Sequence, residues 1–183
     1  MSPMQKPMPK PAGGSGSNMT KIFDQTLAAD SFTIDTGVAI PAGAVALDVF
    51  LWSRTDEASN PGQLWLQFNG DTGANYQWIR TGGSNATSIT SVQPTDNGLA
   101  ILTSSGGSTL PNVWGATRMT IPNYDQTTMP KSAIWTDGYS NDRAFLRNGL
   151  WTNTAAINRI VVVCLTGTQK LKAGSRMAVF TVA

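Results

Sequence analysis

The side chains that could do acid–base or nucleophilic chemistry in this chain are carboxylates and one thiol, because the sequence contains no histidine. Glu57 is the only glutamate, so ten of the 11 acidic residues are aspartates. Without histidine, Ser-His-Asp and Cys-His catalysis cannot arise within the chain. A glycosidase needs only two carboxylates, but these aspartates lie mostly in turns, where Asp bonds its own backbone. We therefore expect a protein that is not an enzyme.

Two clusters of side-chain oxygens have a spacing that could wrap a calcium ion. They are Asn69, Asp71 and Asn75, and Asp137, Asn141 and Asp142. Neither cluster follows the EF-hand pattern, and Asn and Asp also stabilise turns by bonding the backbone. Turn formation is the favoured interpretation, so we expect no metal and no cofactor.

Three aromatic residues, Trp65, Tyr76 and Trp78, are the other candidates for a binding site. Trp65 lies between two glutamines, and the alternation of strand side chains puts Tyr76 and Trp78 on one face. Three interpretations stay open: core of a sandwich, a subunit interface rich in Trp and Tyr, or a platform for sugar rings. The same three apply to Phe50 and Trp52.

The element that positions these aromatic residues is the stretch Leu64–Trp78, with the sequence LWLQFNGDTGANYQW. Leu64, Leu66 and Phe68 alternate with Gln63, Trp65 and Gln67, which predicts one buried face of a strand. The following Asn-Gly-Asp-Thr-Gly tolerates positive φ and bonds its own backbone, so the chain can reverse there. We therefore predict a β-hairpin from Leu64 to Trp78.

Strand-like runs separated by turn residues continue through the rest of 19–183. The longest is 44–54, where Val45, Leu47, Val49 and Leu51 face one way. Further runs cover 88–92, 99–103, 117–121, 133–137, 143–151, 157–166 and 176–182. No repeat of fixed period is present, and only 13% of the residues are charged. These observations predict an all-β domain, a jelly-roll β-sandwich of two antiparallel sheets.

Residues 1–18 form a separate segment, MSPMQKPMPKPAGGSGSN, that has no core of its own. Prolines favour an extended conformation, and Gly13–Ser17 is typical of a flexible linker. We predict an extended N-terminal arm that binds a partner through Pro3, Met4, Lys6, Pro7, Met8, Pro9, Lys10 and Pro11. An appended tag, with Met19 as the start of the protein itself, is the alternative.

The distribution of charge excludes several classes of partner. Lys6 and Lys10 account for the net charge of +2, so the remaining basic and acidic residues cancel. A neutral body argues against nucleic-acid binding, which depends on Lys and Arg. No apolar stretch is long enough to span a membrane, and because the first residues include no apolar h-region we expect no signal peptide. Cys164 lies in an apolar run, where a buried thiol is expected.

The order of these features resembles a family of tailed-bacteriophage virion proteins with a jelly-roll body. The most specific piece is FNGDTGANY at Phe68–Tyr76. The other pieces are the turn Ile40-Pro41-Ala42, Arg54 at the end of a long strand, Trp151–Ile157, and Gly174-Ser175-Arg176 before the last strand. The resemblance covers about residues 30–183.

The resemblance implies a structural protein on the outer surface of the virion, made in the host cytoplasm. A capsid decoration or cement protein is the favoured form, with the major capsid protein or another virion protein as its partner. Self-association into a symmetric oligomer such as a trimer is also expected. A receptor- or glycan-binding module of the tail or a fibre is the alternative, with a surface glycan as its ligand.

Overall fold

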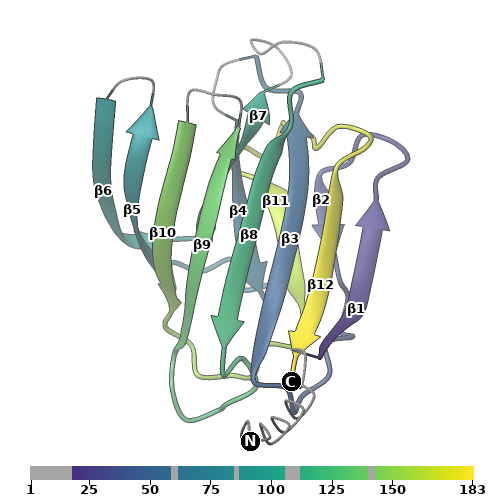
Figure 1. The fold of residues 1–183 in the computed structure, drawn as a ribbon, viewed down its shortest axis with the longest axis vertical. Coiled ribbons are helices and arrows are strands. Elements are labelled where there is room, and N and C mark those ends of the chain that lie inside the picture. The colour runs from purple at the N-terminus through teal and green to yellow at the C-terminus, as the bar shows by residue number, and fades with distance from the viewer. Residues whose placement is uncertain (1–17, 59–61, 85–86, 106–111, 140–142) are drawn as a thin grey trace, which may run out of the picture.

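The computed structural model describes residues 18–58, 62–84, 87–105, 112–139 and 143–183. Within these ranges the chain forms strands and turns and contains no helix, so no helix there could cross a membrane. The strands make two antiparallel sheets, one of eight strands and one of four (Figure 1). The predicted all-β sandwich is confirmed. Apart from Asn18, the predicted arm lies outside the described residues.

The large sheet contains both ends of the described chain. Its strands, in spatial order, are β1 (Met19–Thr26), β12 (Arg176–Val182), β3 (Ala46–Thr55), β8 (Gly115–Pro122), β9 (Lys131–Tyr139), β10 (Arg143–Trp151), β5 (Tyr76–Ser84) and β6 (Thr87–Asp96). The two edge strands are therefore β1 and β6. Met19 pairs with Val182, so residues 1–18 lead into an edge strand.

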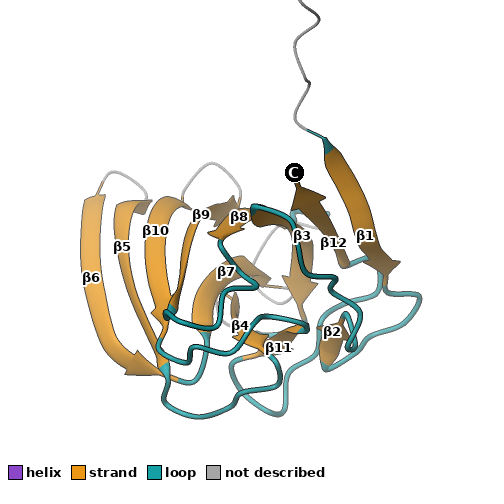
Figure 2. Ribbon diagram, turned by 90° about the horizontal axis from the view of Figure 1, so that it is seen from below, coloured by secondary structure: helices purple, strands orange, loops and turns teal. Residues whose placement is uncertain are grey.

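The small sheet lies against one part of the large sheet. Its order is β2 (Thr33–Asp35), β11 (Ile160–Cys164), β4 (Gly62–Phe68) and β7 (Leu99–Ser105). Its edge strand β7 lies against β8 and β9, and the ends of β3 and β7 meet in a short parallel pairing. Strands β10, β5 and β6 continue the large sheet past this edge (Figure 2). One end of the large sheet therefore extends beyond the small sheet.

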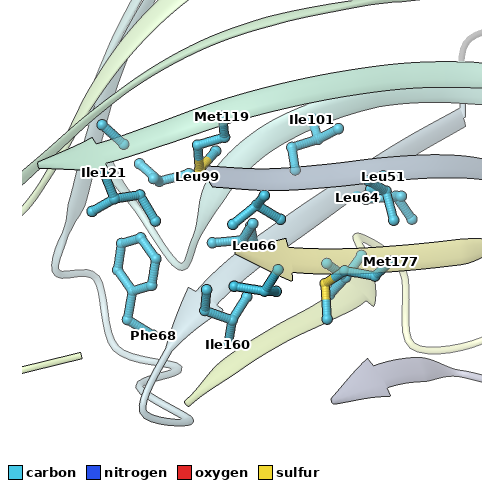
Figure 3. Packing of buried hydrophobic residues seen from close by; sticks show 14 of the residues in the cluster. Leu51, Leu64, Leu66, Phe68, Leu99, Ile101, Met119, Ile121, Ile160 and Met177 are labelled. Carbon is cyan, nitrogen blue, oxygen red and sulfur yellow. The ribbon is translucent and has the colours of Figure 1, made fainter. Parts of the chain in front are cut away.

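The core fills the space between the two sheets, as Figure 3 shows. Leu64, Leu66 and Phe68 are each 0% exposed, as their alternation predicted. The predicted inner face of β3 is also buried at Leu47, Val49 and Leu51, whereas Val45 precedes the strand and is exposed. Removing these side chains from water is the main driving force for closing the sandwich.

The predicted hairpin at Leu64–Trp78 is wrong. Strand β4 pairs with β11 and β7, whereas β5 pairs with β10 and β6, so the two strands lie in different sheets. The turn residues do adopt the expected backbone, with φ of 55° at Asn69 and 70° at Gly70. Positive φ turns the chain but does not choose the partner of the next strand, so the segment crosses from one sheet to the other.

Cys164 is buried at the end of β11, as predicted. Burial raises the pKa of its thiol to about 12 from an ordinary value of 9.0, with a smaller contribution from Asp56 and Glu57. The native thiol should therefore react with a disulfide reagent slower than the unfolded thiol by on the order of 10³-fold, since the thiolate is the nucleophile. Labelling in buffer and in urea measures this ratio. Equal rates in the two conditions would contradict the burial of Cys164.

Candidate functional site

The connection between β4 and β5 forms a corner with the loop that leads from β10 to β11. The Asn69 Nδ2 donates to the Ala156 carbonyl at 2.8 Å. Its Oδ1 accepts from the backbone N–H groups of Asn158 and Arg159 at 2.9 and 3.2 Å. Asn75 adds a second link, because its carbonyl accepts from the Thr152 N–H at 2.9 Å. We call residues 69–75 with 151–159 the inter-sheet corner.

Asp71 is the centre of the inter-sheet corner. Its Oδ2 accepts from the buried Trp151 Nε1 at 2.7 Å, and its Oδ1 accepts from the Gly73 N–H at 2.9 Å. The Asn75 Nδ2 donates to the same carboxylate at 3.0 Å. Partial burial raises the pKa of Asp71, but the bonds from Trp151, Gly73 and Asn75 outweigh burial and hold this pKa below its ordinary value. The carboxylate is therefore ionised and already surrounded by N–H donors.

This geometry favours the turn interpretation of the first candidate calcium cluster, Asn69, Asp71 and Asn75. A cation would have to displace N–H groups, which point their hydrogens at the oxygens it needs. In the second cluster, Asp137 is buried in an ion pair with Arg147, while Asn141 and Asp142 lie outside the described residues. In the described part of the chain, no group of three or more His, Cys, Asp or Glu side chains could hold a metal.

The proposed aromatic platform of Trp65, Tyr76 and Trp78 is not formed. Tyr76 is 0% exposed, stacks on Trp151 with centroids 6.4 Å apart, and accepts from the Phe68 N–H at 2.9 Å. Burial also raises its pKa. Trp65 is on β4 of the small sheet and Trp78 is on β5 of the large sheet, and both are half-buried. The burial of Tyr76 agrees with the core interpretation. Trp65 and Trp78 are apart because β4 and β5 lie in different sheets.

No family model, curated protein or solved structure matches this chain. Its function must therefore be argued from its own residues.

A second aromatic group lies on the outer face of the large sheet, which the small sheet does not cover. Phe50 and Trp52 are two residues apart on β3, so their side chains share one face of the strand. Their rings stack with centroids 6.3 Å apart and planes at 16°. Trp52 is 43% exposed. With Trp114, which precedes β8, they line a groove of about 550 Å³. We call this the outer groove.

The floor of the outer groove consists of small residues from neighbouring strands. In the strand register, Trp52 pairs with Ala116, Ala116 with Gly138, and Gly138 with Ala144. This row crosses β3, β8, β9 and β10, and beyond Trp52 it contains only alanine and glycine. The groove forms because these small residues lie beside larger ones.

Two arginines flank the aromatic pair of the outer groove. Arg118 lies 5.3 Å from the centre of the Phe50 ring and bonds Asp48 at 2.8 Å. Arg176 lies 5.9 Å from the centre of the Trp52 ring. Aromatic and arginine side chains of this kind are enriched at binding hot spots. The outer groove is therefore suited to binding a ring or a partner side chain.

Sequence reasoning had named Phe50 and Trp52 but had missed Trp114 and the small floor. Ala116 is distant in sequence from Gly138 and Ala144, and only the strand register places the three in one row. The eight arm residues from Pro3 to Pro11 lie outside the described residues.

Proposed function

We propose that this chain is a non-catalytic structural protein of a tailed-bacteriophage virion, in the role of a capsid decoration or cement protein. Its β-sandwich body would sit on the outside of the shell as a symmetric oligomer such as a trimer. Its arm, residues 1–18, would lie extended across neighbouring subunits.

The observation that carries this proposal is that the separate pieces of the family resemblance meet in space. Phe68–Tyr76 and Trp151–Ile157 are joined in the inter-sheet corner through Asp71 and Trp151. The Arg54 N–H donates to the Ser175 Oγ at 3.3 Å, so the end of the long strand meets the Gly-Ser-Arg turn. Contacts between these pieces are what a fold shared with the family would require, and they support the resemblance as a whole.

The order of the strands gives separate support for the jelly roll. Without the two hairpins β5–β6 and β9–β10, the large sheet has the order β1-β12-β3-β8 and the small sheet has β2-β11-β4-β7. Successive strands then alternate between the sheets at β1–β2, β3–β4, β7–β8 and β11–β12. We interpret this as eight jelly-roll strands with two inserted hairpins that widen one sheet.

The arm tests the cement role most directly. An extended arm costs on the order of 1–2 kcal/mol per ordered residue, and prolines reduce that cost by stiffening the free chain. Because β1 begins at Met19 and pairs along its length with β12, deletion of residues 2–17 should leave the fold intact. The truncated protein should then lose binding to capsids in co-sedimentation, with an unchanged melting temperature.

A matched control separates the chemistry of the arm from its length. A variant in which residues 2–17 are replaced by a Gly/Ser segment of equal length should also fail to bind. Full capsid binding by either variant would contradict the role of the arm.

The outer groove favours a second candidate, a receptor- or glycan-binding module of the tail or a fibre. Its exposed Trp52 and half-buried Phe50 could stack on sugar rings. Under this alternative, Trp52→Ala would abolish glycan binding, and the arm would attach to a tail or fibre protein. Cross-linking of Lys6 and Lys10 to virion proteins distinguishes the two functions by the partner that is captured.

A further inference from the structure

Three arginines gather on the inner face of the large sheet, at the end that extends past the small sheet. Arg143 and Arg147 are on β10, and Arg80 is directly opposite Arg147 on β5. Strand alternation places Arg143, Phe145 and Arg147 on one face of β10. That face is the inner one, because Phe145 and Arg147 are buried while Ala144 and Leu146 between them are exposed. We call Arg80, Arg143 and Arg147 the arginine cluster.

Two aromatic rings lie beside Arg80 and Arg147. The guanidinium carbons of Arg80 and Arg147 lie 5.2 and 5.3 Å from the centre of the Phe145 ring. The same two groups lie 5.9 and 5.4 Å from the centre of the Trp78 ring. Two cations are therefore fixed beside the same pair of rings, which offsets part of the cost of bringing like charges together.

The charge of the cluster is not balanced by the described residues around it. Asp137 is the one carboxylate there that forms an ion pair with it, through the Arg147 Nε at 3.0 Å. Among the described residues, neither Arg80 nor Arg143 has an ion pair. The nearby Asp96 accepts from the Trp78 Nε1 at 2.9 Å and forms no ion pair either. Counted over the described residues alone, the cluster therefore carries an excess of positive charge.

The hydrogen bonds of the cluster are also incomplete. Arg147 is only 2% exposed, and its Nη2 has no hydrogen-bond partner in the part of the chain that the structure describes. The Nε atoms of Arg80 and Arg143 are also buried without a partner among those residues. A buried guanidinium with unused donors is costly, because each donor has lost its water without a replacement. An acceptor that carries negative charge would satisfy the donors and the charge together.

We propose that the arginine cluster is a binding site for an oxyanion, such as a phosphate, a sulfate or a carboxylate. Arg80 is half-exposed on β5 and would contact the ligand, and the buried Arg147 directly opposite it on β10 would add positive charge. The half-exposed Arg143, four residues before Arg147 on β10, would approach the ligand from further along the strand. Planar guanidinium groups match the geometry of such oxygens and can bind them through two parallel hydrogen bonds. The side chains of Arg80 and Arg147 are on the face of the large sheet opposite to Phe50 and Trp52, whereas Arg143 also lines the outer groove. The proposal does not depend on the virion role.

The test compares thermal unfolding in sodium phosphate and in sodium sulfate with unfolding in sodium chloride of equal ionic strength. Binding to the folded state raises the melting temperature with saturation. Both anions also stabilise proteins non-specifically, so Arg80→Met and Arg143→Met are compared with Lys21→Met. Lys21 is an exposed residue of β1 that also carries one positive charge. We expect an affinity at least about tenfold weaker in either arginine variant and unchanged in Lys21→Met.

A conservative variant keeps the test informative if Arg80→Met folds poorly. Arg80→Lys retains the charge but loses the planar pair of donors, so it should bind phosphate more weakly than the wild type. An equal rise of melting temperature in the wild type and all arginine variants would overturn the proposal. The absence of any saturable binding by the wild type would overturn it too.

Two sources of the oxyanion are then distinguished with small probes measured by calorimetry. Glucuronate and acetate each carry one carboxylate, and only glucuronate has a sugar ring. Tighter binding of glucuronate therefore assigns the site to the acid group of a saccharide. Equal binding of the two assigns it to a free small oxyanion.

Discussion

Replacing Arg147 with Met is expected to lower the free energy of unfolding by about 3–5 kcal/mol, as when one partner of a buried ion pair is removed. The side chains of Arg147 and Asp137 are 1% and 0% exposed and lie 3.0 Å apart. Met fills much of the space of the arginine stem but leaves the Asp137 charge buried without a contacting cation. Urea unfolding followed by circular dichroism measures the loss.

The loss should depend on pH. Burial raises the pKa of Asp137 above its ordinary value of 3.8, and Arg147 opposes that rise together with the Leu102 N–H. Without Arg147 this pKa rises further, so the folded variant holds a proton that the unfolded chain releases. Stability of the variant therefore falls as the pH rises from about 4 towards neutrality, and its deficit against the wild type is smallest in acid.

Two controls separate the buried charge from the loss of packing. Asp137→Asn in the Arg147→Met background keeps an oxygen for the Leu102 N–H, which now donates to Asp137 at 2.8 Å. This double variant should recover most of the loss, because no charge remains buried. Arg176→Met, at the exposed pair with Asp24, should lose far less. A loss from Arg147→Met no larger than that from Arg176→Met would contradict the interpretation.

The strands and the core could be predicted because both depend on local patterns. Leu64, Leu66 and Phe68 are spaced two apart and share one face, and all three are buried where the alternation placed them. The pattern of β3 was equally clear, with Leu47, Val49 and Leu51 buried. Alternation says which side chains share a face, and one face of each of these strands must be covered in any sandwich.

The pairing of β4 and β5 could not be predicted in this way. Asn69 and Gly70 allow a sharp change of direction, and that signal is the same for a hairpin and for a crossing between sheets. The crossing is accompanied by a contact from a residue distant in sequence, because Trp151 at the end of β10 bonds Asp71. A pattern within fifteen residues contains no information about that contact.

Both candidate sites were hidden for the same reason. The small floor of the outer groove and the arginine cluster each exist only when β10 is placed beside its two neighbours. Arg80 and Arg147 are far apart in the chain, and nothing near either of them marks it as a ligand for an anion. From the sequence we considered only the total charge of residues 19–183, which is zero. A total of zero gives no sign of a local excess of positive charge.

The inter-sheet corner provides the second large effect. Asp71→Ala is expected to lower the free energy of unfolding by about 1–3 kcal/mol, the cost of leaving a buried donor unsatisfied. The donor is the Trp151 Nε1, on a side chain that is 1% exposed and bonds Asp71 at 2.7 Å. Thermal unfolding should show a lower melting temperature with little change in the far-ultraviolet spectrum, because the strands persist while the corner loosens.

The reason for this effect can be tested with the partner residue. In a Trp151→Phe background, Asp71→Ala should cost clearly less, since no N–H is left to be satisfied. Asp71→Asn should also cost less than Asp71→Ala, because its amide keeps an acceptor. Since the pKa of Asp71 is held below its ordinary 3.8, its charge stabilises the fold above about pH 4, and this contribution disappears as the pH falls through the lowered value. An Asp71→Ala deficit that is the same with Phe as with Trp at position 151 would show that the bond to Trp151 does not hold the corner.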